Sequence, residues 1–564
     1  MTARSARDWV RLGAETTAVE STLAKLAADE FAARAWSRDP FIWKADEKHR
    51  AVISDALGWL DAPSEMRRRS RELAEWAAHA RRGRRYVVVC GMGGSSLAPE
   101  VFGRVLGRAD APELLVLDST SPEQVRSVRE RIDPDSTLFV IASKSGSTLE
   151  TLCHFRYFHA EVARRSRSEE ETGEHFVAVT DSGSPLEKLA AEHRFAEVFE
   201  NLPGIGGRYS ALSYFGLVPA ALCGVDLALL LGRAEEAAQA CRSHGADNPG
   251  LVLGAALATL ARAGRNKATL VCSPAIAPFG AWLEQLVAES TGKEGVGIVP
   301  VDGEPLGWPE DYGSDRFFLY ERLGGDAENG DADARLERLA EEGHPVQARA
   351  WKDPYDLGGR MFTWELAIAA AGAVLGIDPF DQPNVQESKD NTRTVLAEFE
   401  RTRSLPQEKP KLADHGLAFT GDLPASLFAK ARAGRDYIAI QAYVERNEEN
   451  EKTLRGVRRI LRDRTRCATT VGFGPRFLHS TGQLHKGGPR EGIFLQLVDP
   501  GPADVPIPGA AYGFATFLRA QAIGDEKALR ERGLPVSRAA ASSPSRAALP
   551  AWAEHLRRAA EGKR

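Results

Sequence analysis

The chain reads YVVVCGMGGSS over residues 86–96, an apolar run that passes into a glycine-rich loop. A short unbroken apolar run is typical of a strand buried on both faces, as in parallel sheets covered by helices. Glycines at the end of such a strand let the backbone approach a ligand, and the helix that follows offers free N–H groups to an anion. A tight strand-to-helix turn without a ligand explains the loop equally well.

The same pattern of strand, polar loop and helical stretch recurs along the next hundred residues. It predicts a doubly wound α/β domain over 81–245. The further strands are expected at 114–117, 138–141 and 176–179.

A second domain of the same kind is predicted over 246–403, followed by a smaller C-terminal α/β unit over 416–535. A loop at 404–415, rich in Pro, Lys and Glu, separates the two. Residues 1–80 are expected to form a helical segment, because apolar residues recur there at three and four positions. The Ala-, Ser- and Arg-rich residues 536–564 are expected to form a loosely packed tail. The second domain should contain strands at 269–272, 298–301, 317–320 and 346–351 and a helix at 361–375; the third should contain strands at 437–440 and 493–497 around a charged helix at 447–464.

Composition narrows the classes of function. Of 564 residues, 43% are hydrophobic and 27% charged, as in ordinary globular proteins, and 73 basic against 78 acidic residues argue against a nucleic-acid coat. Six scattered cysteines show no CxxC spacing, which disfavours a metal site and suits a reducing, cytoplasmic setting. The N-terminus lacks the apolar core of a signal peptide, and the most apolar stretch, 212–231, is interrupted by Pro219 and Asp226, so no membrane span is expected.

The loop SKSGST, residues 143–148, is the strongest candidate for an anion site. It follows a predicted strand and combines four hydroxyls, a lysine and a helix start, which are the groups that bind a phosphate. Helix capping alone needs fewer hydroxyls. No GxxxxGK[ST] element occurs, which disfavours a nucleotide.

Three further segments carry candidate catalytic side chains. Arg208 lies on a glycine-rich loop and could present a fixed guanidinium to a developing negative charge. Gln285 and Glu289 are four residues apart and share one helix face, with Glu289 in a last turn whose dipole opposes a negative charge. Lys389 lies nearly two turns into a helix that begins near Pro383. Taken singly, each of these charged residues is more often a solvated side chain.

Taken in order, these segments resemble the glucose-6-phosphate isomerase family over residues 85–395. The most specific signatures are Gly-Gly-Arg-Tyr-Ser at 206–210 and Phe-Asp-Gln-Pro at 380–383, with Glu-Ser-x-Gly-Lys at 289–293 as a third. The resemblance implies two doubly wound parallel-sheet sugar-isomerase (SIS) domains. It is nearest to the isomerase half of bifunctional transaldolase/glucose-6-phosphate isomerases, although no transaldolase part is evident here.

The resemblance also assigns roles to residues. Glu289 would move the proton between C2 and C1, Arg208 would face the enediolate oxygens, and Lys389 would assist ring opening. The substrate and its phosphate would be bound by Gly94, Ser95, Ser143, Lys144, Ser145 and Thr148, and its hydroxyls by Gln285 and Gln382.

The sequence departs from the family pattern at two places. Asn384 and Gln386 replace a usual glycine and glutamate, and the segment at 313–317 replaces an element that normally carries the ring-opening histidine. The later run His-Ser-Thr-Gly-Gln-Leu-His at 479–485 resembles that element. It makes His485 the preferred substitute and His479 the second candidate, although either histidine could equally serve packing or capping.

These observations predict an enzyme that interconverts glucose 6-phosphate and fructose 6-phosphate, in glycolysis and gluconeogenesis, with no metal and no cofactor. Its expected partner is a hexose phosphate, with neither nucleic acid nor membrane. Three alternatives stay open: an isomerase that also accepts mannose 6-phosphate, a non-catalytic sugar-phosphate sensor, and a functional link to a transaldolase. A homodimer with shared sites is usual in the family, but the third unit could replace the partner's contribution.

Overall fold

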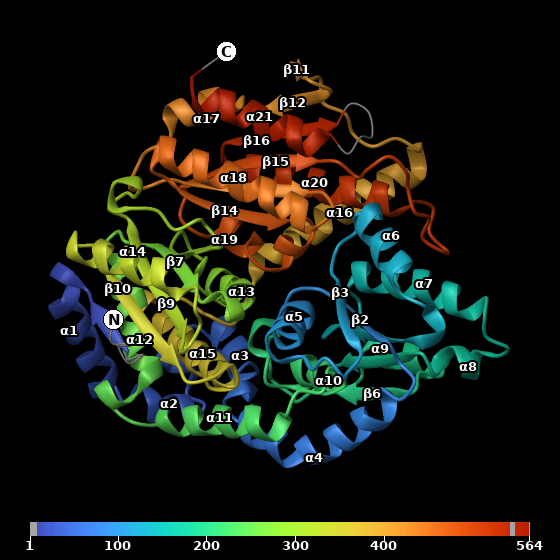
Figure 1. Ribbon diagram of the computed structural model, residues 1–564, viewed down its shortest axis with the longest axis horizontal. Coiled ribbons are helices and arrows are strands. Elements are labelled where there is room, and N and C mark those ends of the chain that lie inside the picture. Colours follow the sequence, from blue (N-terminus) through green and yellow to red (C-terminus); the bar gives the residue numbers. More distant parts are fainter. Residues whose placement is uncertain (1–7, 542–546, 563–564) are drawn as a thin grey trace.

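The computed structural model describes residues 8–541 and 547–562. Three α/β units lie around a common centre, with the N-terminal helices along the outer side of the first two (Figure 1). Within the described residues, no helix is both long enough and apolar enough to cross a membrane.

The first unit is a five-stranded, wholly parallel sheet in the order β3-β2-β4-β5-β6. Val87 and Val89 of β2 belong to one apolar cluster and Val88 and Cys90 to another, so both faces of the sheet are covered. This confirms the predicted buried strand and the doubly wound arrangement. The elements are β2 (Tyr86–Gly91), α5 (Gly94–Leu106), β3 (Glu113–Leu117), α6 (Pro122–Arg131), β4 (Thr137–Ala142), α7 (Leu149–Ala163), α8 (Glu169–Gly173), β5 (Phe176–Thr180), α9 (Pro185–Glu192), β6 (Glu197–Glu200) and α10 (Tyr214–Leu222).

The second unit has the order β1-β10-β9-β7-β8, with four parallel strands and an antiparallel edge strand. That edge strand, β1 (Trp9–Arg11), lies within the segment predicted to be helical; the following α1 (Thr16–Ala28), α2 (Phe31–Trp36), α3 (Glu47–Ser54) and α4 (Ala62–Ala80) are helices as expected. The other elements are α11 (Leu227–Ala240), α12 (Pro249–Arg262), β7 (Lys267–Cys272), α13 (Phe279–Thr291), β8 (Val299–Asp302), β9 (Arg316–Leu323), α14 (Asn329–Glu341), β10 (Val346–Trp351), α15 (Asp356–Leu375) and α16 (Pro383–Thr402).

The third unit is a six-stranded mixed sheet in the order β11-β12-β16-β15-β13-β14. Its last four strands are parallel and repeat the doubly wound arrangement in smaller form. Its elements are β11 (Leu412–Asp414), β12 (Leu417–Gly421), α17 (Pro424–Lys430), β13 (Tyr437–Tyr443), α18 (Glu448–Thr465), β14 (Ala468–Phe473), α19 (Gly482–Gly487), β15 (Gly492–Val498), α20 (Phe514–Glu531), β16 (Val536–Ala541) and α21 (Ala548–Ala560).

The expectation of a loosely packed tail after residue 536 was wrong for its described part. β16 pairs with β12 on one side and β15 on the other, inside the third sheet. Trp552 of α21 is 1% exposed and packs in the core of the third unit. The segment is ordered by tertiary contacts that its small-residue composition does not show.

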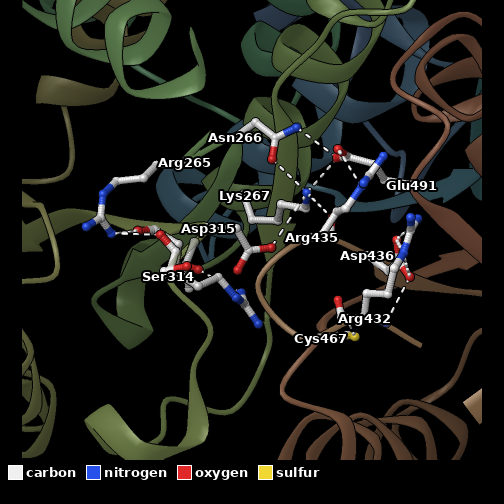
Figure 2. Close-up of polar contacts among 12 residues, drawn as sticks. Arg265, Asn266, Lys267, Ser314, Asp315, Arg432, Arg435, Asp436, Cys467 and Glu491 are labelled. Atoms are coloured by element: carbon white, nitrogen blue, oxygen red, sulfur yellow. Dashed lines mark hydrogen bonds and ion pairs between the residues drawn. The ribbon is translucent and has the colours of Figure 1, made fainter. Parts of the chain in front are cut away.

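A buried polar cluster joins the second and third units (Figure 2). The Lys267 ammonium, 1% exposed, donates to the Glu491 carboxylate at 2.7 Å and to the Arg435 carbonyl at 2.5 Å, and lies 3.6 Å from Asp315. Nearby, the Glu304 carboxylate pairs with the Arg316 guanidinium at 2.8 Å and accepts from the Thr469 backbone N–H at 2.8 Å. The third unit is therefore fixed to the second through charges that are buried on the side of the second unit and mostly buried at Glu491.

Candidate active site

The SKSGST loop lies between the carboxyl end of β4 and the start of α7. Thr148 occupies the N-cap position of α7, yet its hydroxyl makes no capping bond and instead lies 2.9 Å from the Ser143 hydroxyl. Ser145 and Ser147 are paired in the same way at 3.1 Å. In a simple helix start, the hydroxyl of the N-cap residue would bond to a backbone N–H of the first turn. Here that hydroxyl does not cap the helix and bonds to another hydroxyl instead. The Lys144 ammonium turns to Asp181 at 2.7 Å and is partly exposed.

A cavity of about 150 Å³ adjoins this loop. Ser145, Ser147 and Thr148 line one side, Lys389 of α16 a second, and His479 of the third unit a third. Three segments far apart in the sequence thus meet around one small polar space.

Helix α13 places Gln285 and Glu289 beside that space. The Gln285 amide nitrogen donates to Glu289 Oε2 at 3.0 Å and to the His479 carbonyl at 2.8 Å, which links the carboxylate to the histidine segment. The Gln285 Oε1 atom is buried without a hydrogen-bond partner among the described residues. A buried amide oxygen without a partner is unfavourable, so this atom is suited to accept from a ligand hydroxyl.

Arg208 is 2% exposed and held from four directions. Its guanidinium donates to the Ser290 hydroxyl at 2.7 Å, the Gln382 amide oxygen at 2.9 Å and the backbone oxygens of residues 379 and 381. Its Nη1 atom lies 3.2 Å from Glu289 Oε1. The positive charge is thus fixed next to the carboxylate with little freedom to move.

The absence of side chains in the glycine loop lets Gln285 and His479 lie close to its backbone. Gly93 has a φ of +58°, and a Cβ there would lie 2.8 Å from both the Gln285 amide nitrogen and the His479 carbonyl. A Cβ at Gly94 would lie 1.8 Å from the Gly207 carbonyl. Gly94 and the following Ser95 are both buried at the start of α5 and do not line the cavity.

His479 ends a short 3-10 turn at 476–479 and forms a buried dyad with Glu150. The two side chains lie 2.9 Å apart, and Gln521 donates to the same Glu150 oxygen at 2.8 Å. Burial raises the pKa of Glu150, but the adjacent His479 and other favourable contacts outweigh it and lower the pKa to about 2. Glu150 is therefore an ionised partner that orients the imidazole.

His485, the preferred histidine of the sequence analysis, is not brought to this cavity. Its ring packs among Tyr437, Phe477 and Phe494 and lies 3.4 Å from the Gln441 amide. Burial lowers the pKa of His485 well below its ordinary value. Its surroundings are those of a core histidine.

The structure therefore brings one set of the expected residues together and leaves others aside. Ser145, Thr148 and Lys389 line the cavity, and Ser143 is bonded to Thr148. Gln285 reaches the cavity wall through the His479 carbonyl, and Glu289, Arg208 and Gln382 follow from Gln285 in a chain of contacts. Lys144 and His485 point elsewhere. Glu150 and Gln521 were missed; the position of Glu150 next to the loop was the one available signal.

Fold and site together define a doubly wound α/β protein that gathers polar groups near the carboxyl end of β4, with side chains from α13 and α16 of the second unit and from the third unit. A family model described as phosphoglucose isomerase matches residues 27–303. The glucose-6-phosphate isomerase of Symbiobacterium thermophilum is 30% identical over 402 residues, which are 62% of this chain and 90% of that protein. The one from Carboxydothermus hydrogenoformans is 28% identical over 408 residues, 62% of this chain and 87% of that protein.

The solved structure of a glucose-6-phosphate isomerase from Chlamydia trachomatis superposes with a TM-score of 0.52 and 22% identity, covering 66% of this chain and 78% of that one, which supports the fold. The chain belongs to the phosphoglucose isomerase family.

Proposed function

We propose that this chain is a glucose-6-phosphate isomerase, which moves the carbonyl of an opened hexose phosphate between C1 and C2 through a cis-enediolate. The observation that carries the proposal is the buried Glu289 carboxylate, 3.2 Å from the Arg208 guanidinium and linked through Gln285 to the cavity beside the SKSGST loop. The reaction belongs to glycolysis and gluconeogenesis.

Binding starts with the phosphate. The hydroxyls of Ser143, Ser145 and Thr148, together with the free N–H groups at the start of α7, would donate hydrogen bonds to the phosphate oxygens in place of the present contacts between the hydroxyls. The cavity of about 150 Å³ is smaller than usual ligand sites, so the segments that line it must separate on binding.

Ring opening needs a proton donor at the ring oxygen and an acceptor at the C1 hydroxyl. Lys389 and His479 both line the cavity and would form this pair. With its Nε2–H donated to the ionised Glu150, the His479 ring has its other nitrogen available to the sugar. His479 thus replaces His485 in the proposed mechanism.

Proton transfer follows on the open sugar. Glu289 takes the C2 proton, the electron pair forms the C1–C2 double bond, and the negative charge moves to O1 beside Arg208. The O2 hydroxyl proton passes to O1, and Glu289 returns its proton to C1, which leaves the carbonyl at C2.

The described residues of this one chain supply every group named here, so the mechanism requires no second copy. A link to a transaldolase remains an expectation from the family resemblance. The six free cysteines, five of them buried, suit a reducing compartment, and we propose a cytoplasmic location.

The test is Glu289→Gln, which keeps the shape and removes the base. Turnover of glucose 6-phosphate should fall roughly 10²–10⁴-fold with KM little changed. The matched control is Glu294→Gln, an exposed glutamate paired with Lys44, which should keep wild-type turnover. Near-normal turnover in Glu289→Gln would exclude this base, and the same assay with mannose 6-phosphate reports the epimer preference.

A further inference from the structure

A second and larger cavity, of about 490 Å³, lies where the three α/β units meet. Helix α5 forms the wall from the first unit, α13 with β8 the wall from the second, and α18 with β14 the wall from the third. In Figure 1 α5, α13 and β14 lie near the middle of the molecule, where the three units meet. Its volume is in the range of small-molecule sites, whereas the proposed active-site cavity is below it.

The two cavities are distinct but adjacent. Arg476 and Ser480 line the larger one, while His479, between them in sequence, lines the smaller one. Likewise Glu284 of α13 faces the larger cavity, and its neighbour Gln285 contacts the His479 carbonyl.

Within the described part of the chain, two of the arginines that line the larger cavity, Arg455 and Arg458, have no ion-pair partner. Arg446 and Arg476 share Glu100, at 2.9 and 2.5 Å. In contrast, no carboxylate of the described chain lies within ion-pair distance of Arg455 or Arg458. Among the described residues Arg458, which is 2% exposed, donates only to Thr469, through the Thr469 carbonyl at 2.5 Å and its hydroxyl at 3.4 Å. Its charge is balanced at longer range by Glu304, Asp302 and Glu284, so an anion in direct contact would stabilise this buried guanidinium further.

Two carboxyl groups opposite these arginines are equally without a basic partner at ion-pair distance in the described residues. Burial, followed by repulsion from Asp302, raises the pKa of Glu284 to about 8, and burial raises the pKa of Asp302 to about 6. At neutral pH Glu284 is thus largely a neutral acid that can donate a hydrogen bond, while Asp302 accepts. Such groups recognise hydroxyls, and Phe473 and Phe477 add apolar surface.

We propose that this junction cavity binds a small phosphorylated polyol, with its phosphate against Arg455 and Arg458 and its hydroxyls against Glu284 and Asp302. The phosphate is favoured because two unpaired guanidiniums match a dianion with several acceptor oxygens. This site is additional to the proposed active site.

Calorimetric titration with D-glucitol 6-phosphate tests the proposal, because this polyol has no carbonyl and cannot isomerise. The full-length wild type should bind two equivalents. Arg455→Met and Arg458→Met should each weaken one equivalent about 10- to 100-fold, as expected for a lost charge-assisted contact. Ser143→Ala with Thr148→Ala should weaken the other equivalent and leave this one.

The matched control is Arg459→Met, an exposed neighbour on α18 that does not line the cavity, and it should bind like the wild type. Arg455 is exposed, so its variant stays informative if Arg458→Met unfolds. A single equivalent that survives both arginine changes, or no binding at all, would overturn the junction site. A single equivalent lost only in the arginine variants would support it and count against the proposed phosphate loop.

Discussion

At the scale of the residue, the site depends on the fixed guanidinium of Arg208. Guanidinium offers five donors in a rigid fork, and here they meet a hydroxyl, an amide oxygen, two backbone oxygens and Glu289. A shorter or more flexible cation would leave several of these buried oxygens unpaired. In the proposed mechanism the charge is therefore in place before the enediolate forms, which is the condition for strong electrostatic stabilisation.

Mutations of His479 and His485, the two candidate histidines of the third unit, should have clearly different effects. His479→Gln should lower turnover of the cyclic substrate on the order of 10²-fold, because it removes the proposed ring-opening group. His485→Gln should leave turnover near normal and lower the melting temperature, because His485 packs in an aromatic core. Coupled assays and thermal melts of both variants check this, and the reverse pattern would restore His485 to the site.

The sequence could not distinguish these histidines. The Thr-Gly-Gln-Leu-His run resembles the missing family element and therefore drew attention to its final residue. Which ring faces the cavity depends on the 3-10 turn at 476–479 and on the buried Glu150, and both are consequences of tertiary packing. By contrast, Glu289, Arg208 and Lys389 could be proposed from the sequence, because short motifs surround them.

At the scale of the element, α13 couples the core to the site. Trp282, Leu283 and Leu286 are buried in the main core, and Gln285 and Glu289 are buried on the same helix beside them. The prediction that Gln285 and Glu289, four residues apart, share one helix face is confirmed by a direct hydrogen bond between them. The apolar side chains thus hold the helix in place, and the polar pair is positioned with it.

Changes in the SKSGST loop should weaken substrate binding and have little effect on the chemical step. Replacing Ser143 and Thr148 with alanine removes two hydroxyls from the phosphate and should raise KM about 10- to 100-fold with a smaller effect on turnover. Steady-state kinetics with fructose 6-phosphate measures this. Thr394→Ala, an exposed α16 hydroxyl bonded to the Asp390 carbonyl, serves as control. An unchanged KM would mean that the loop does not bind the phosphate.

The packing between elements explains why the sequence departs from the family pattern at 384–386 and at 313–317. The backbone N–H and side chain of Asn384 both contact Gln483 of α19, at 2.9 Å each. Asp315 and Arg316, in the segment that replaces the missing histidine element, lie in the buried cluster with Lys267 and Glu304. Both departures thus fall where the third unit packs against the second.

At the scale of the whole molecule, the chain forms three sheets, and the differences from the predicted secondary structure lie mainly at its ends. Continuous apolar strands such as β2 and β4 could be predicted, because burial on both faces leaves a direct signal in the sequence. β16 and α21 could not, because their Ala- and Arg-rich residues become buried only through the sheet that they join. The large junction cavity likewise depends on all three units being assembled.

The buried cluster at Lys267 should control the attachment of the third unit. Lys267→Met removes the cation that lies 2.7 Å from Glu491 and 3.6 Å from Asp315, leaves Glu491 with Arg435 alone at 4.0 Å, and should lower the free energy of unfolding by about 3–5 kcal/mol. Lys452→Met, an exposed α18 lysine, should change it by less than about 0.5 kcal/mol. Urea denaturation measures both, and equal stability of the two variants would show that the cluster contributes little.

The attachment of His479 to the same polypeptide as Glu289 has a consequence for enzymology. If one chain contributes every reacting group, the number of active sites equals the number of chains, whether or not the chains associate. Specific activity should then stay constant on dilution from micromolar to low nanomolar protein. A progressive loss over that range, reversed on reconcentration, would reveal that a neighbour completes the site.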